Sequence, residues 1–481
     1  MAPVVEIGHR PAMTVSTETG EGRDRTASGT IAPLGWGGHV RATLVLGVPL
    51  VGSHLGLMLI NTTDTVMLGW YSVEALAAAV LATPIFFTVM IFGSGFSQAV
   101  MPIAAHAEGK GDIRGVRRAV RMGLWVSIAF SALVMPFLWY TEPLLLALGQ
   151  QPVIAALAGD YMRIAQWAMF PALAAQGLRA FLSAVERPRV IFWSTVAGAL
   201  LNVLLNWMLI FGNWGAPELG VRGAAFASLG TTTLTFAVLA AHVVIDRKAA
   251  EYEIFARFWR PDWPDLFEVL RLGLPISITI LAEVGIFVLS SVMMGWLGVV
   301  PLAAHGIAMQ LASIAFMVPM GLSQAATVRV GRAFGRGDAL GVTRAAAAAM
   351  GVCLAFATTS ALVFWSIPAT LISLFLDNTE PQAPAVVAYA VPLLMIAALF
   401  QLFDNAQAVG VGLLRGLKDT RVPMVLAILS YWGAGFSLAY LLGFVADLGG
   451  AGVWFGLAGG LAVAAATMNV RFFFLRPKPQ R

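Results

Sequence analysis

The sequence has little charge and almost no cysteine for its length. Only 11% of its 481 residues are charged, and Cys353 is its single cysteine. One cysteine cannot form an intrachain disulfide or a CxxC zinc site, so both are excluded. The chain also lacks the GxxxxGK[ST] phosphate loop and the HExxH and GxSxG patterns of hydrolases. ATP is therefore not indicated as an energy source for this chain alone, and we expect no enzyme activity.

The sequence is rich in long hydrophobic segments. Hydrophobic residues make up 59% of the chain, and the mean hydropathy is +0.81. The charges cluster between hydrophobic runs of about 20 residues or more, the length that a helix needs to cross a bilayer. We therefore predict an all-α membrane protein with both termini on one side. Its twelve spans lie at roughly 40–68, 73–103, 117–139, 155–184, 189–212, 219–245, 267–297, 302–329, 341–369, 384–414, 420–446 and 449–475.

The net charge of +5 follows the connections between these spans. Alternate connections carry Lys110, Arg114, Arg117, Arg118, Arg121, Arg187, Arg189, Arg247, Lys248, Arg257, Arg260, Arg332, Arg336, Lys418 and Arg421. The opposite ones carry Glu74, Glu142, Glu218, Asp377, Glu380 and Asp447. Because Lys and Arg in short loops face the cytoplasm, we expect a multi-pass protein of the inner (cytoplasmic) membrane with both termini inside. Basicity of this kind gives no reason to expect a nucleic-acid partner.

The predicted domains follow from the spans. Residues 1–38 are rich in Gly, Ser, Thr, Arg and Glu without apolar periodicity, so we predict a disordered cytoplasmic tail. Residues 39–245 and 267–475 then form an N-lobe and a C-lobe of six helices each. Residues 246–266 form a cytoplasmic linker between them, and 476–481 form a second tail.

The two halves repeat one another at a spacing of 226 residues. At this spacing Pro49 matches Pro275, and the motif Ser-Gln-Ala at 97–99 recurs at 323–325. Gly111-Asp112 likewise matches Gly337-Asp338. Six spans is an even number, so both halves have the same topology and are related by an axis along the membrane normal. Repeats of this kind are typical of transporters that bind substrate between the halves near the midplane.

Three acidic residues stand inside otherwise apolar spans: Asp64, Glu283 and Asp404. A carboxylate at such a position costs about 2.5–3.5 kcal/mol even on the lenient insertion scale, so each should face a cavity, an ion or a partner. The repeat places Ser290 opposite Asp64 and Leu57 opposite Glu283. The acids are therefore not a duplicated structural device, and each lobe has a polar site of its own.

The candidate N-lobe site combines Asp64 with Asn202 and Asn206. The two asparagines are four residues apart and share one helical face. Carboxylate and carboxamide oxygens suit an alkali cation, so these three residues are candidate Na⁺ ligands. The Thr231–Thr233 run could add a hydroxyl. Interhelical hydrogen bonding is the alternative role for two asparagines in a membrane.

The candidate C-lobe site contains Glu283 and Asp404, with aromatic neighbours Phe287 and Phe403. Two acids near one another can carry a proton or attract an organic cation. Aromatic faces add cation–π contacts worth about 0.5–2 kcal/mol each. Packing or lipid contact is the alternative role for each phenylalanine.

Several segments together resemble the multidrug and toxic compound extrusion family. They are NTTDTVMLG around Asp64, LSQAATVRVGRAFGRGD at 322–338 and LLRGLKDTRVP at 413–423. The resemblance covers about residues 40–475. It implies twelve helices in two six-helix lobes and export of organic cations and drugs against a sodium or proton gradient.

Within that family the sequence is most similar to the NorM-like branch. The resemblance implies that Asp64, Asn202 and Asn206 form an N-lobe cation site, to which a helix-6 threonine, matched here to Thr232, contributes. It also assigns Glu283 and Asp404 to coupling and drug binding. Where the branch can carry a tyrosine four residues before the second acid, this chain has Phe400.

We therefore interpret the chain as a monomeric secondary-active exporter. It exchanges Na⁺ or H⁺ for cationic, amphiphilic small molecules and contacts membrane lipid, with no cofactor besides the coupling ion. A lipid-linked-precursor flippase of the same superfamily is the alternative, and it should carry fixed cations in its groove. Arg179 and Arg415 are expected at cytoplasmic helix ends, and only Arg163 intrudes, with Asp160 as its partner. For an intramembrane enzyme or a channel, the sequence lacks the nucleophile, the metal ligands or the selectivity filter that such a protein needs.

Overall fold

The computed structural model describes residues 35–376 and 381–477, and within these ranges the chain forms helices and turns without β-strands. Most of the predicted tail, residues 1–34, lies outside the described residues, as do 478–481. The tail boundary at residue 38 is wrong, because the first helix already begins at Trp36. The linker boundary at 266 is also late, since the seventh span begins at Trp263. In both places a turn of helix continues beyond the most apolar part of the span.

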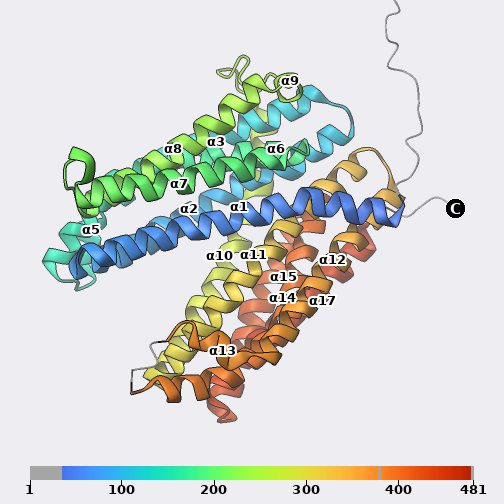
Figure 1. Ribbon diagram of the computed structural model, residues 1–481. Helices are drawn as coiled ribbons and strands as arrows, with labels where there is room; N and C mark the ends of the chain where they lie inside the picture. The colour runs from blue at the N-terminus through green and yellow to red at the C-terminus, as the bar shows by residue number, and fades with distance from the viewer. Residues whose placement is uncertain (1–34, 377–380, 478–481) are drawn as a thin grey trace, which may run out of the picture. The chain divides into compact units, whose positions relative to one another are not determined.

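The N-lobe is built from six spans, shown in blue to green in Figure 1. They are α1 (Trp36–Tyr71), α2 (Val73–Gly109), α3 (Ile113–Trp139), α5 (Pro152–Ala165) with α6 (Met169–Ala184), α7 (Pro188–Phe211) and α8 (Val221–Ile245). Short helices α4 (Thr141–Ala147) and α9 (Arg247–Ala250) lie in connections. A single 3₁₀ turn, η1 (Gln166–Ala168), joins α5 to α6, so the fourth predicted span is one segment in two parts.

The C-lobe follows in yellow to red. Its spans are α10 (Trp263–Leu297), α11 (Val299–Gly335), α12 (Ala339–Ser366), α14 (Ala383–Gly416), α15 (Arg421–Ile428) with its continuation to Val445, and α17 (Gly449–Leu475). That continuation comprises the π-helix η3 (Leu429–Phe436), α16 (Ser437–Tyr440) and a second π-helix, η4 (Leu441–Val445), and α13 (Pro368–Ser373) is a short connection. Eleven spans of the described chain are long and apolar enough to cross a membrane. The divided α5–α6 segment supplies the twelfth position, so the predicted architecture is confirmed.

The repeat is visible in the backbone. Helices α2 and α11 each have 37 residues and are related by the 226-residue spacing. Asp112 and Asp338 both accept a hydrogen bond from the backbone N–H three residues later, at 2.9 and 2.7 Å, and so cap α3 and α12. The glycines before them, Gly111 and Gly337, share a φ of +72°. Equivalent sequence thus gives equivalent helix starts.

The lobes meet through equivalent close contacts. A Cβ on Gly95 of α2 would lie 2.5 Å from the backbone nitrogen of Ser277 on α10. A Cβ on Gly321 of α11 would lie 2.7 Å from that of Val51 on α1. Both pairs keep the repeat spacing, so the same glycine position allows backbone approach on each side. Ser277 also donates to the Phe92 carbonyl at 2.6 Å.

Polar contacts between the lobes lie toward the N-terminal end of α1 and the C-terminal ends of α2 and α11. Arg329 of α11 donates to the His39 carbonyl, and at 2.8 Å to Thr43 Oγ1, both on α1. One turn later Arg332 pairs with Glu108 of α2 at 3.5 Å. Gln324 and His54 meet at 3.0 Å. The lobes are therefore joined over the halves of α1, α2 and α11 that adjoin the basic connections.

Candidate functional site

Two helices of the N-lobe, α7 and α8, donate hydrogen bonds to Asp64 of α1. Both asparagines of α7 donate to Asp64 Oδ1, Asn202 from 2.9 Å and Asn206 from 2.5 Å. Ser228 of α8 donates to the other carboxylate oxygen at 3.2 Å. Asn202 and Asn206 are fully buried, so the carboxylate is held from one side by groups away from water. The structure thus brings together the three residues that the sequence placed at one site.

The two amides present their NH₂ groups to the carboxylate. A carboxylate only accepts hydrogen bonds, so this orientation satisfies Asp64. It leaves Asn206 Oδ1 buried without a hydrogen-bond partner among the described residues, while Asn202 Oδ1 accepts from Asn206 at 3.3 Å. The sequence predicts both amides as oxygen ligands. To ligate a cation together with Asp64, an amide must turn so that its oxygen replaces its nitrogen.

Thr232 does not reach Asp64 by a described hydrogen bond. Its hydroxyl donates to the carbonyls of Ser228 and Leu229 in its own helix, at 2.9 and 3.0 Å. One turn earlier, Ser228 occupies the position that faces the carboxylate. Residues four apart share a helical face, so Thr232 lies on the same side of α8 as Ser228, one turn farther along the helix. A serine in an apolar span is a weak signal, which is why sequence reasoning passed over Ser228.

Tyr161 of α5 is a second neighbour that sequence reasoning missed. It is buried, and it lies near Ser228, Thr83 and Asp64. The chain has only seven tyrosines, and this one follows directly on Asp160 in α5. Helices α1, α5, α7 and α8 therefore all contribute polar groups here.

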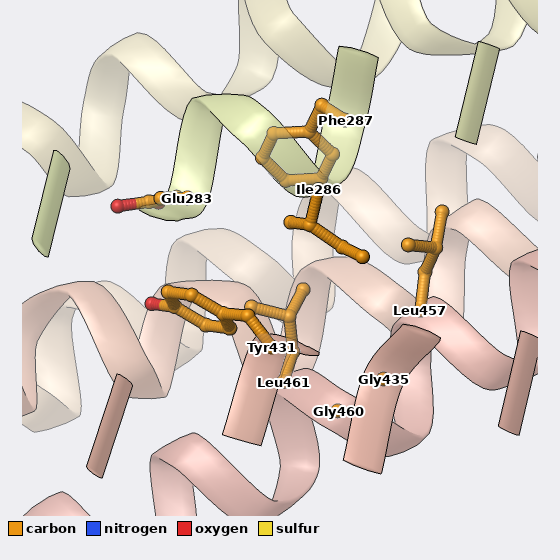
Figure 2. Close-up of a pocket in the computed structure, with 8 residues that line it drawn as sticks. All are labelled: Glu283, Ile286, Phe287, Tyr431, Gly435, Leu457, Gly460 and Leu461. Carbon is orange, nitrogen blue, oxygen red and sulfur yellow. The ribbon is translucent and has the colours of Figure 1, made fainter. Parts of the chain in front are cut away.

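In the C-lobe, Glu283 of α10 borders a cavity of about 10 Å³, about the room that one water molecule needs. Figure 2 shows its carboxylate and the Tyr431 hydroxyl at the same end, with Phe287 and Leu457 farther along. Tyr431 lies on the π-helix η3, a backbone form that often occurs at functional sites. A drug-sized molecule needs much more room, so this site must open to receive one.

Asp404 of α14 is 4% exposed and has no described partner for its Oδ1 atom. Glu283 and Asp404 are close enough for their carboxylates to interact electrostatically, and Tyr431 is close enough to interact with both. Tyr431 also accepts a hydrogen bond from Gln407 at 2.6 Å. The two predicted acids thus belong to one cluster with Tyr431, which the sequence pattern does not single out.

The three candidate phenylalanines have different surroundings. Phe287 lines the cavity beside Glu283 and meets Phe400 edge to face, with ring centroids 6.0 Å apart. Phe400 is 2% exposed and packs on Trp454 at 5.6 Å. Phe403 is partly buried against the C-lobe core. Of the three, only Phe287 lines the cavity as found, and Phe400 supports it from behind.

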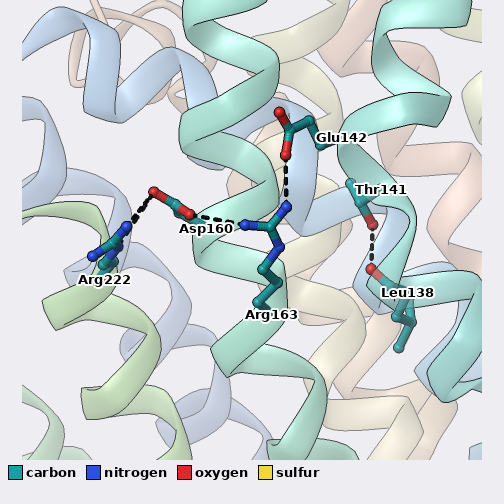
Figure 3. Close-up of polar contacts among 6 residues, drawn as sticks. All are labelled: Leu138, Thr141, Glu142, Asp160, Arg163 and Arg222. Carbon is teal, nitrogen blue, oxygen red and sulfur yellow. Dashed lines mark hydrogen bonds and ion pairs between the residues drawn. The ribbon is translucent and has the colours of Figure 1, made fainter.

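Arg163, the cation expected inside the N-lobe, forms ion pairs with two acids. Figure 3 shows it between Asp160, at 3.5 Å, and Glu142, at 2.8 Å. Asp160 in turn pairs with Arg222 of α8 at 2.7 Å. The expected partner is present, and a second acid and a second arginine complete a chain of ion pairs that links α4, α5 and α8. Arg163 is therefore not a fixed cation available for a phosphate group.

Arg415 of α14 faces the other lobe. It donates to Gln98 of α2 at 3.2 Å and lies within range of Glu283. Arg179 of α6 donates to Thr195 at 3.2 Å. Arg415 stands one residue before the end of α14, and Arg179 stands five residues before the end of α6.

Comparison with known proteins decides the family. A family model described as MatE matches residues 49–208 and 275–441, once in each lobe. The chain belongs to this family, the multidrug and toxic compound extrusion transporters. A relative from Rhizobium meliloti, described as a probable multidrug resistance protein NorM, is 51% identical over 92% of this chain and 94% of its own. One from Pseudomonas aeruginosa with the same description is 39% identical over 90% and 89%.

Solved MatE structures share the fold. The eukaryotic MATE transporter AtDTX14 superposes with a TM-score of 0.80 at 19% identity, covering 92% of this chain and 96% of its own. A multidrug resistance MATE family transporter in an outward-facing conformation gives 0.80 at 20%, covering 91% and 95%. The chain is thus a multi-pass membrane transporter of the NorM-like branch and not an enzyme, as the resemblance implied.

Proposed function

We propose that this MatE protein is a multidrug exporter of the cytoplasmic membrane. It exchanges external Na⁺ or H⁺ for cytoplasmic organic cations by alternating access and acts as a monomer. The NorM relatives described as multidrug resistance proteins support the transport class. The observation that carries the coupling proposal is the N-lobe carboxylate, Asp64, held by three donors from two other helices.

The N-lobe site fits the coupling ion. Asp64 and the unpartnered Asn206 Oδ1 supply oxygens, and Ser228 adds a hydroxyl. Hard oxygen ligands of this kind suit Na⁺, while the carboxylate alone suffices for H⁺. Ion entry competes with the amide donors for Asp64 and so changes how α1 is held against α7 and α8. This is the differential contact that alternating access requires.

The C-lobe cluster fits the cationic substrate. Glu283 and Asp404 supply negative charge, and Phe287 supplies a ring face beside Glu283. The lobes touch near the ends that carry the basic connections, which corresponds to an outward-facing state if those connections are cytoplasmic. On this proposal the narrow cavity widens when the lobes part on the cytoplasmic side.

The test is counter-transport by the purified protein in proteoliposomes. An inward Na⁺ gradient should drive a fluorescent organic cation outward, against the cation's own concentration gradient, when a protonophore has collapsed the proton gradient. If H⁺ is the coupling ion, an inward proton gradient without Na⁺ should drive the same movement. Transport with neither gradient would contradict secondary active export. Movement of a lipid-linked precursor in place of the cation would favour the flippase.

A further inference from the structure

A second cavity, of about 300 Å³, lies apart from both candidate sites. It is bordered by α10 and by the turn that joins α14 to α15. Its charged and polar lining residues are Glu268, Arg271, Lys418, Asp419, Thr420 and Arg421. Helix α15 begins at Arg421, and the turn is one of the basic connections at the membrane boundary. The proposed transport function uses none of these residues.

The acids that line this cavity are already neutralised. Glu268 pairs with Lys418 at 2.7 Å, and Asp419 pairs with Arg471 of α17 at 2.6 Å. Arg271 and Arg421 are exposed at the rim, and neither has an ion pair within residues 35–376 and 381–477. The cavity therefore keeps two positive charges that no described acid balances.

Thr420 provides the independent observation at the cavity. It is 3% exposed, and its hydroxyl is buried without a hydrogen-bond partner among the described residues. It occupies the N-cap position of α15, yet its side chain does not cap the helix. The first N–H groups of a helix have no partner in the helix itself, and the helix dipole favours an anion there. A donor hydroxyl, a helix start and two arginines thus converge on one space.

We propose that this cavity binds a phosphate group. Arginine side chains hold phosphate oxygens through paired N–H donors, and helix starts bind the same group through backbone N–H. The Thr420 hydroxyl would gain the partner that it lacks. Basic pockets between helices at the membrane boundary recognise anionic lipid headgroups. The phosphate belongs either to such a headgroup or to a free phosphate ion, and the same residues hold it in both cases.

The N-lobe contains a matched turn. The N–H groups of Glu186 and Lys418 bond the carbonyl three residues before them, and both residues have a positive φ, of 58° and 61°. At the position of Thr420 the N-lobe turn has Pro188, which has no hydroxyl. Arg189 then corresponds to Arg421 and is also exposed. This turn offers a basic side chain on a similar backbone without the Thr420 hydroxyl.

The experiment titrates dioleoyl phosphatidylglycerol into the purified full-length protein in neutral maltoside micelles and counts bound lipid by native mass spectrometry. Phosphatidylcholine, whose phosphate is balanced by choline, is the parallel titration. The variants are Arg271→Gln, Arg421→Gln, their combination, and Thr420→Val, with Arg189→Gln as the matched control. Thermal unfolding in micelles confirms that each variant is folded, and the single variants serve if the double does not fold.

We expect phosphatidylglycerol binding to weaken about fivefold for each arginine removed and to weaken in Thr420→Val, while Arg189→Gln leaves it unchanged. Phosphatidylcholine binding should be weak and equal in all variants. Inorganic phosphate, compared with chloride at equal ionic strength, identifies the source. If it stabilises the lipid-free protein through the same arginines, the ligand is the free ion, and if it has no effect, the ligand is the lipid headgroup. Equal loss of lipid in Arg189→Gln, or no loss in the double variant, would overturn the site.

Discussion

Asp64 in the N-lobe and Asp404 in the C-lobe are both carboxylates inside spans, yet the protein holds them differently. Asp64 receives three hydrogen bonds from α7 and α8. Asp404 is more enclosed, has an oxygen without a described partner and lies within range of a second acid, Glu283. A buried charge without donors is costly until a cation or a proton balances it. The N-lobe site is therefore built in advance, while the C-lobe site is completed by what binds there.

This difference suggests separate roles for the lobes on the proposed function. Small shifts of a few donors suffice for a small ion, so a compact site such as that of Asp64 fits the coupling ion. A bulky cation brings its own charge and needs apolar surface, which Phe287 and Leu457 supply. Four sets of variants break or sharpen the comparison.

Neutralising the N-lobe acid should have the largest effect. Asp64→Asn should abolish ion-driven export because the coupling ion loses its only formal negative charge in that site. The protein should still insert and fold, since the amide keeps the shape and can bond to Asn202 and Asn206. Efflux of a fluorescent cation from proteoliposomes measures the loss, and size-exclusion chromatography checks folding. Wild-type export by this variant would remove Asp64 from the ion site.

Neutralising a C-lobe acid should weaken substrate binding selectively. Glu283→Gln or Asp404→Asn should lower the affinity for an organic cation by at least about tenfold, since unit charges a few ångströms apart interact by more than about 1.4 kcal/mol at an effective dielectric constant of 20. An uncharged analogue of the same shape should lose much less. Fluorescence titration of both ligands makes the comparison, and equal losses would mean that the acids serve structure only.

Changing the asparagines should separate ion ligation from helix bridging. If Asn202 and Asn206 ligate Na⁺, Asn206→Ala should raise the Na⁺ concentration for half-maximal efflux by about tenfold. If they only bridge helices, Asn→Ala should lower stability by about 0.6 kcal/mol and leave ion dependence unchanged. Asn202→Asp should shift coupling toward protons, because two adjacent carboxylates favour a proton between them. The measurement is efflux at a series of Na⁺ concentrations and external pH values. If both variants keep the Na⁺ and pH dependence of the unmodified protein, the asparagines do not ligate the ion.

The smallest expected effect tests the register of α8. Ser228→Ala should raise the Na⁺ requirement by about threefold, the loss of one ordinary hydrogen bond near the carboxylate. Thr232→Val is the matched control, because both hydrogen bonds described for its hydroxyl go to carbonyls of its own helix. The same efflux assay reports both. A larger effect of Thr232→Val than of Ser228→Ala would restore the register that the family resemblance implied.

Much of the fold could be predicted because hydrophobic length and the repeat act locally. The start of α2 at Val73 and the end of α10 at Leu297 are as predicted. Errors lie at polar ends, as where α2 runs on to Gly109 and the expected end was 103. There the last turn of α2 packs against the other lobe, where its Glu108 pairs with Arg332 of α11, and hydropathy does not record such a contact.

The candidate site was only partly predictable. Acids in apolar spans are conspicuous, and the four-residue spacing puts Asn202 and Asn206 on one face, so these residues could be found. Ser228 could not, because a serine hydroxyl in a helix often bonds to its own backbone. Tyr431 could not, because nothing in the sequence around it shows which groups of other helices its hydroxyl meets. Their positions depend on the rotation of α8 and on the π-helical turn of η3, which packing against other helices sets.

The sequence by itself determined the number and order of the spans and the acids that must avoid lipid, since both follow from the cost of polar groups in a bilayer. It also carried the internal repeat, in residues that match at a spacing of 226. Only the tertiary structure decided which neighbours those acids have. Contacts such as that between Asp64 and Ser228, which are 164 residues apart in the chain, depend on how helices rotate against one another. Shifting a helix by one turn leaves its hydropathy almost unchanged, but it changes which side chains face the site.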